Sequence, residues 1–146
     1  PTMNKVFELQ SDHPLFRYFT EAERDRIENI GELRRVPAEA YLISAGETDA
    51  TLFAVEDGHL DIVAMREDGP AVVATVGPGD VLGEVSFLDD SPRTTSVRAG
   101  EDALVRAWDK RTLSEALAFE PQLLAKFAVA MCELLVERMR DTARRV

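Results

Sequence analysis

The sequence is poor in the residues that build metal, redox and hydrolytic sites. It has one cysteine, Cys132, and two histidines, His13 and His59, among 146 residues. A single cysteine excludes a disulfide within the chain, and isolated histidines without neighbouring soft ligands argue against a zinc site. With so few histidines, the serines also lack a partner for a hydrolytic triad. We therefore expect neither catalytic nor metal-binding residues.

Long apolar runs and an excess of positive charge are missing as well. No apolar stretch approaches the roughly 18 residues of a membrane span, and the first residues, PTMNKVFELQ, lack the apolar core of a signal peptide. Lys and Arg number 17 against 27 Asp and Glu, a net charge of −10 that disfavours a nucleic-acid surface. We expect a cytoplasmic protein without direct contact to membrane or nucleic acid, in which a few aimed donors build any anion site.

The hydrophobic fraction of 45% suits one domain, and the pattern along the chain changes twice. Residues 10–35 contain the helix-start signals Ser11, Asp12 and Pro14 and then apolar residues at helical spacing, which predicts an N-terminal helical segment. From 36 to 108, short runs such as TLFAV, LDIVA and AVVATV alternate with turn signals such as DG and GPGD. Strands at this spacing are typical of a β-sandwich or barrel.

Residues 109–146 return to a helical pattern. Asp109 is suited to cap a short helix, and Glu120-Pro121 to begin a long one. The long helix carries an apolar stripe of Leu124, Phe127, Ala128, Met131, Leu134, Leu135 and Met139. This stripe predicts a homodimer through the helix, with burial inside one subunit as the alternative. Cys132 lies in the same pattern and is expected to be a small buried residue.

The segment LGEVSFLDDSPRTTSV, residues 82–97, contains residue types that packing explains poorly. Gly83 lets a ligand approach the backbone, Glu84 follows it, and VSFLD is long enough for one helical turn whose first N–H groups would face an anion. A Ser-Pro turn then presents Arg93. A guanidinium donates two parallel hydrogen bonds to a phosphate, and a carboxylate accepts from a ribose hydroxyl. This spacing matches a ribose fused to a cyclic phosphate; a Glu84–Arg93 salt bridge in a structural loop is the alternative.

The segment resembles the phosphate-binding cassette of the cyclic nucleotide-binding domain family, which includes catabolite activator proteins, cyclic-nucleotide-dependent kinases and gated channels. That cassette runs Phe/Leu-Gly-Glu, an apolar and small-residue stretch, then Pro-Arg followed by Ala, Ser or Thr; LGEVSFLDDSPRTTS fits it without a gap. Gly46, Gly58 and Gly79 resemble the glycine pattern of the family's β-roll. The resemblance implies a mainly β fold of the α+β class: an eight-stranded antiparallel β-roll, or jelly roll, with an N-terminal helical segment and two C-terminal helices.

The resemblance also implies a role for each cassette residue. Glu84 would accept a hydrogen bond from the ribose 2′-hydroxyl, and Arg93 would bind the cyclic phosphate. The backbones of Gly83, Val85 and Ser86 would help at the start of the small helix. These five residues form the expected phosphate and ribose site.

The expected contacts to the base come from the end of the cassette and from other parts of the chain. Thr94 holds the position where family members with Thr tend to favour cGMP and those with Ala favour cAMP. Thr95 stands where Ala is common, and its role is open. Leu60 and Val73 are expected as apolar contacts to the ribose or base, and Arg138 on the long helix as a contact to the purine.

The implied function is that of an allosteric sensor that binds a cyclic mononucleotide, cGMP in preference to cAMP, without altering it and without a cofactor. The chain would be a stand-alone receptor or a module of a larger signalling protein whose effector domain lies outside it. The alternatives are a ligand-free structural or interaction β-roll, and a cyclic-dinucleotide receptor or small hydrolase on the same scaffold. The presence of both Glu84 and Arg93 argues against a ligand-free β-roll. The shortage of further basic or catalytic residues argues against a cyclic-dinucleotide receptor or a hydrolase.

Overall fold

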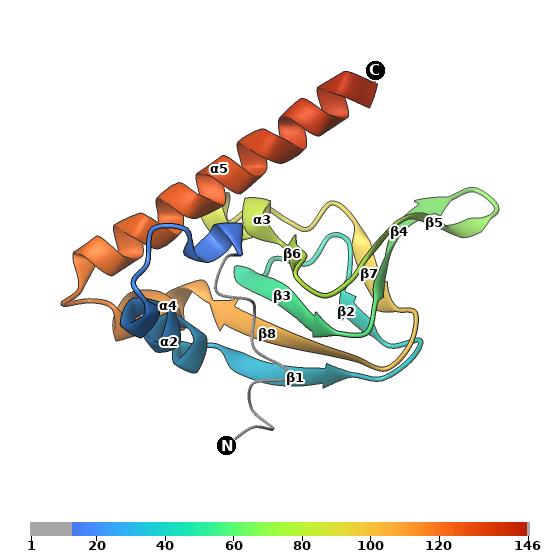
Figure 1. Ribbon diagram of the computed structural model, residues 1–146. Helices are drawn as coiled ribbons and strands as arrows, with labels where there is room; N and C mark the ends of the chain where they lie inside the picture. Colours follow the sequence, from blue (N-terminus) through green and yellow to red (C-terminus); the bar gives the residue numbers. More distant parts are fainter. Residues whose placement is uncertain (1–12, 146) are drawn as a thin grey trace.

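Two antiparallel four-stranded sheets form the centre of the molecule (Figure 1). The computed structural model describes residues 13–145, and the side chains of 13–141; the predicted helix-start signals Ser11 and Asp12 lie outside this range. The first sheet has the order β1 (Glu32–Val36), β8 (Ala103–Asp109), β3 (Thr51–Asp57), β6 (Val81–Leu82). The second has the order β2 (Tyr41–Ile43), β7 (Ser96–Ala99), β4 (Leu60–Arg66), β5 (Gly69–Val76). The predicted eight-stranded antiparallel β-roll is confirmed.

The helices flank this roll as expected, with one corrected boundary. They are η1 (Pro14–Phe16), α2 (Glu21–Ile30), α3 (Glu84–Asp89), α4 (Lys110–Ala116) and α5 (Pro121–Arg145). The N-terminal helical segment does not reach residue 35, because Gly31 ends α2 and residues 32–36 pair with β8. Only Val36 of β1 is buried, so the alternation that predicts a strand is absent there. Among the described residues, no helix is both long and apolar enough to cross a membrane.

Strand β3 lies at the centre of the core because both of its faces are covered. Leu52 and Ala54 belong to the cluster between the first sheet and the helices, whereas Phe53 and Val55 belong to the cluster between the two sheets. Alternate residues of a strand point to opposite faces, which explains this division. Phe53 also pairs with Leu82, so β3 fixes the position of β6, the strand that leads directly into α3.

Helix α5 runs beside the roll, and its C-terminal part extends past it (Figure 1). Phe127 and Met131 of the predicted stripe are buried, together with Leu123 and Ala130, which the stripe did not include. Met139 is 70% exposed. The buried residues recur at the three- and four-residue spacing of one helix face. Whether an apolar residue of α5 is buried therefore depends on the face on which it lies, not on its hydrophobicity alone.

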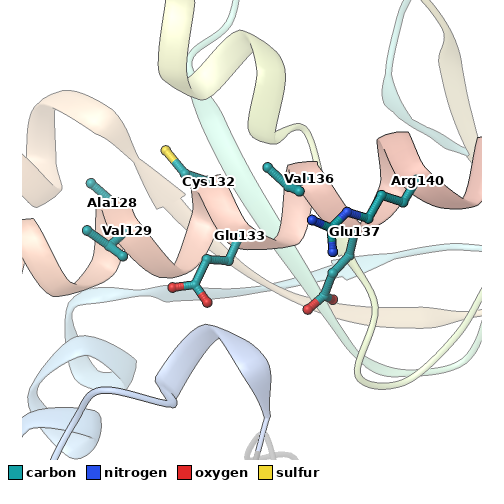
Figure 2. Close-up of a pocket in the computed structure, with 7 residues that line it drawn as sticks. All are labelled: Ala128, Val129, Cys132, Glu133, Val136, Glu137 and Arg140. Atoms are coloured by element: carbon teal, nitrogen blue, oxygen red, sulfur yellow. The ribbon is translucent and has the colours of Figure 1, made fainter.

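The outward side of α5 forms an open groove of about 440 Å³. Figure 2 shows its lining residues, Ala128, Val129, Cys132, Glu133, Val136, Glu137 and Arg140. The prediction that Cys132 is buried is therefore wrong: its thiol is exposed, because it lies off the face that packs on the roll. Glu133 and Glu137 accept hydrogen bonds from Arg17, at 2.7 and 3.5 Å, and so join the helix to the N-terminal segment.

Candidate functional site

The site begins at a sharp turn between β6 and α3. Gly83 has φ +84°, a left-handed conformation that glycine adopts readily. A Cβ atom there would lie 2.6 Å from Arg93 Nη1 and 2.9 Å from the Thr51 carbonyl oxygen. Glycine is thus required both by the backbone and by the close approach of the Arg93 side chain.

Arg93 is a buried cation held by three parts of the chain. Its side chain is 3% exposed and packs near the Phe53 ring, with the guanidinium carbon 5.9 Å from the ring centroid. Nη1 donates to the Gly83 carbonyl at 3.1 Å. Nη2 donates to the Thr51 carbonyl at 2.7 Å and to Asp49 Oδ2 at 3.3 Å. These contacts fix the guanidinium beside the first turn of α3.

The backbone of Arg93 is fixed by the loop between β2 and β3. The Arg93 N–H donates to the Glu47 carbonyl, and the Gly46 N–H donates to the Arg93 carbonyl, both at 2.8 Å. Gly46 has φ +89°, so this loop makes a turn that favours glycine. The predicted cassette is therefore held in place by a loop about 45 residues earlier in the sequence.

Glu84, the first residue of α3, is buried and paired with α5. Arg138 Nη1 donates to Glu84 Oε1, and Arg138 Nη2 donates to the Val81 carbonyl. Burial raises the pKa of Glu84 above its ordinary value, an effect that the charges of Arg138 and then Arg93 oppose. The alternative expected from the sequence, a direct Glu84–Arg93 salt bridge, does not form. Glu84 pairs with Arg138, and Arg93 pairs with Asp49.

These residues surround a pocket of about 170 Å³. It is lined by Ile43, Ile62, Leu82, Gly83, Glu84, Val85, Ser86, Arg93, Thr94, Thr95, Val97 and Arg138. The structure thus brings together every expected cassette residue and Arg138. Two lining residues each keep a buried polar atom without a partner in the described structure: the acceptor Glu84 Oε2 and the donor Arg93 Nε.

Two of the residues expected near the ligand do not line this pocket. Leu60 is fully buried in the cluster between the sheets, and Val73 is 48% exposed on β5. Ile62, two residues along β4 from Leu60, lines the pocket in its place. The alternation of a strand identifies which face points inward, but not which residue on that face lies beside a distant loop.

Sequence reasoning also missed several members of the site. Ile43, Ile62 and Val97 form an apolar wall, and Asp49 pairs with Arg93. The three apolar residues come from β2, β4 and β7, which neighbour one another only in the folded sheet. Asp49 lies in a loop whose sequence has no distinguishing pattern, so only the folded structure shows its contact with Arg93. No group of three or more His, Cys, Asp or Glu suited to a metal ion occurs among the residues described.

Comparison with known proteins identifies the family. The chain matches the family described as "Cyclic nucleotide-binding domain" over residues 33–118. A cAMP-dependent protein kinase regulatory subunit of Mycosarcoma maydis is 33% identical over 98 residues, which cover 65% of this chain and 19% of that protein. The Acetyltransferase Pat of Mycolicibacterium smegmatis is 31% identical over 97 residues, covering 64% of this chain and 29% of that protein.

A solved structure extends the similarity to nearly the whole chain. The crystal structure of the Thermus thermophilus Catabolite Activator Protein aligns with a TM-score of 0.78 at 25% identity, covering 90% of this chain and 61% of that chain. The present chain belongs to the cyclic nucleotide-binding domain family, and the resemblance stated from its cassette is confirmed. It spans 19% to 29% of the length of the two curated relatives named above.

Proposed function

We propose that the chain binds a cyclic mononucleotide in the pocket beside α3 and acts as an allosteric sensor that leaves its ligand chemically unchanged. The observation that carries this proposal is the pair of unpartnered buried atoms, Arg93 Nε and Glu84 Oε2, contributed by two residues of one pocket. Buried polar atoms without partners are rare in folded proteins, since each costs about 1–3 kcal/mol. A ligand with an anionic acceptor and a hydroxyl donor would satisfy both.

A cyclic nucleotide has these two groups at adjacent positions. Its phosphate would accept from Arg93, whose guanidinium is already oriented by Gly83 and Thr51. Its ribose 2′-hydroxyl would donate to Glu84 Oε2 while Arg138 keeps Oε1. The backbones of Gly83, Val85 and Ser86, which line the same pocket, would complete the phosphate site.

Arg138 receives a different role from the one that the sequence suggested. Its guanidinium donates to Glu84 and Val81, so a contact to guanine O6 and N7 would require it to leave these partners. We propose that it instead keeps Glu84 ionised and holds α5 against the pocket. A positive charge beside a buried carboxylate favours the charged form that accepts a hydroxyl.

The preference for cGMP depends on Thr94. This residue lines the pocket and its side chain is exposed to an incoming ligand. Its hydroxyl can accept from the guanine 2-amino group, which adenine lacks. The hydrogen bond is worth about 1 kcal/mol, a preference of about fivefold rather than an exclusion of cAMP.

The output of the sensor would come from a part of the protein outside residues 1–146. The chain covers less than a third of the two curated relatives named above, one a kinase regulatory subunit and the other an acetyltransferase. We propose an effector domain elsewhere in the protein, a homodimer formed through α5, and a cytoplasmic location. Exposed Val129 and Val136 on the outward side of α5 support the dimer. Of the two basic residues that line the pocket, Arg138 is paired with Glu84, which leaves Arg93 for one phosphate and favours a mononucleotide over the alternative dinucleotide ligand.

Calorimetric titration of the purified chain with cAMP, cGMP and the linear 5′-nucleotides tests this function. We expect saturable binding of a cyclic nucleotide and weaker binding of the linear nucleotides, whose phosphate lacks the cyclic ester geometry. A folded chain that binds neither cyclic nucleotide at millimolar concentration would instead support the ligand-free alternative.

A further inference from the structure

The hydrogen-bond donors of Arg93 are mostly in use before any ligand binds. A guanidinium has five N–H donors, and a two-oxygen anion can bind it at the Nη1–Nη2 fork or at the Nε–Nη2 fork. Backbone carbonyls of Gly83 and Thr51 accept from Nη1 and Nη2. The first fork therefore already points at main-chain oxygens, whereas Nε is buried without a partner in the described structure.

At the Nε–Nη2 fork, buried Nε has no partner in the described structure, whereas Nη2 already has two acceptors. Nη2 donates both to the Thr51 carbonyl at 2.7 Å and to Asp49 Oδ2 at 3.3 Å, so both of its hydrogens are engaged. A phosphate that binds this fork needs one of them. Asp49 is the partner able to release it, because its contact is the longer one and its side chain is 40% exposed.

The charges of the site lead to the same residue. Arg93 and Arg138 carry two positive charges, and their partners Asp49 and Glu84 carry two negative charges, so these four groups sum to zero. A cyclic phosphate adds one negative charge close to Asp49. Like charges sharing a guanidinium repel each other, and the partial exposure of Asp49 screens this repulsion without abolishing it.

We infer that Asp49 is an internal counter-ion of Arg93 that competes with the phosphate of the ligand and sets the affinity of the site. The inference rests on the proposed function, whose ligand it concerns. Without ligand, Asp49 stabilises the buried guanidinium; with ligand, it opposes the incoming anion. Removing its charge therefore has two effects of opposite sign, whereas a merely structural residue would weaken folding and binding together.

The test compares Asp49→Asn with Glu47→Gln. Arg93 and Thr51 donate to different oxygens of Asp49. In asparagine the amide oxygen can still accept from Arg93 while the amide N–H donates to the Thr51 hydroxyl, so the change removes charge and little shape. Glu47 lies in the same loop, is exposed, and contacts Arg93 through its backbone oxygen, which makes it a matched control. Thermal unfolding is measured in a buffer free of phosphate and sulfate, and binding of cAMP and cGMP by calorimetry.

Asp49→Asn is expected to lower the unfolding midpoint of the ligand-free chain and to raise the affinity for cyclic nucleotide by about threefold or more. Glu47→Gln is expected to leave both nearly unchanged. Equal or weaker nucleotide binding by folded Asp49→Asn would overturn the inference. If Asp49→Asn does not fold, Asp49→Ser is measured against the same expectations.

Measurements with two probes, cyclic nucleotide and inorganic phosphate, distinguish a failure of this inference from a failure of the proposed function. If the unchanged chain binds no cyclic nucleotide, the proposed function fails, and inorganic phosphate becomes the probe of the guanidinium. A larger phosphate-induced rise in unfolding midpoint for Asp49→Asn than for the unchanged chain would then support the counter-ion role. An equal or smaller rise would overturn it.

Discussion

Glu84 is the residue whose protonation most directly affects the site. Burial holds the pKa of this carboxyl above its ordinary value, so it takes up a proton at a higher pH than an exposed glutamate does. The ionised form accepts a hydrogen bond from the Arg138 guanidinium and, in the proposed complex, another from the ribose hydroxyl. The affinity for cyclic nucleotide is therefore expected to fall as pH is lowered toward the raised pKa.

Glu84→Gln provides the control for this pH dependence. The amide has nearly the same shape but does not titrate, so the variant should bind more weakly at neutral pH and lose less affinity on acidification. Affinities measured by calorimetry between about pH 7.5 and 5.5 decide the point. A pH profile that is identical in the variant and the unchanged chain would show that another group is responsible.

Thr94 is expected to decide the preference between the two nucleotides. Thr94→Ala removes the hydroxyl proposed to bond the guanine amine, so the ratio of cGMP to cAMP affinity should fall by up to about fivefold. Thr95→Ala is the matched control, because Thr95 lines the same pocket one residue further on. Competition against one fluorescent analogue gives both affinities. An unchanged ratio in Thr94→Ala removes this residue as the selector.

At the residue scale, site residues that lie close together in the sequence were more predictable than those that only the fold brings together. Gly83, Glu84 and Arg93 were predictable because one short motif contains them all. Asp49 and Ile43 were not, because their place in the site depends on how β2, β3 and β7 pair. Arg138 was predicted near the ligand from its position on the helix, but its partner Glu84 depends on how α5 lies across β6.

At the scale of elements, α5 is expected to act as a lid that Arg138 connects to the pocket. Its hydrogen bonds to Glu84 and Val81 join the C-terminal half of α5 to the start of α3 and to β6. Removing the residues after Glu137 deletes this connection and should speed ligand release more than it slows capture, since lost contacts appear mainly in the dissociation rate.

Stopped-flow release of a fluorescent cyclic nucleotide measures this effect. Arg138→Ala separates the side chain from the rest of the removed segment and should reproduce most of the increase. A shortened chain that stays folded and releases ligand at the unchanged rate would show that Arg138 and the end of α5 do not hold the ligand.

The boundaries of elements were predictable where caps and turns are explicit. Asp109 accepts from the Thr112 N–H at 3.0 Å and Pro121 begins α5, both as expected from the sequence. The Thr20 capping box with Glu23 was not predicted, and residues 32–35 of β1 were predicted to belong to the N-terminal helical segment. The sequence of β1, ELRRV, is charged and pairs with β8 through its backbone, which side-chain patterns do not reveal.

At the scale of the whole molecule, the outward side of α5 is the surface proposed to join two copies. Val136→Glu places a charge in the middle of the groove shown in Figure 2 and should shift a dimer toward monomer. Met65→Glu, on the exposed part of β4, changes an exposed apolar residue far from that groove and should not. Sedimentation equilibrium measures both, and a chain that is monomeric without substitution would exclude the dimer.

The central claim, that this pocket binds a cyclic mononucleotide through Arg93, is tested most directly by calorimetric titration of Arg93→Ala. Truncating one partner of a buried charge pair typically costs about 2–5 kcal/mol, so affinity should fall by at least about tenfold. Arg98→Ala, on β7 and outside the pocket lining, should bind like the unchanged chain. The account predicts this contrast with a native far-ultraviolet spectrum in both variants. Unaltered nucleotide affinity in a folded Arg93→Ala protein would contradict it.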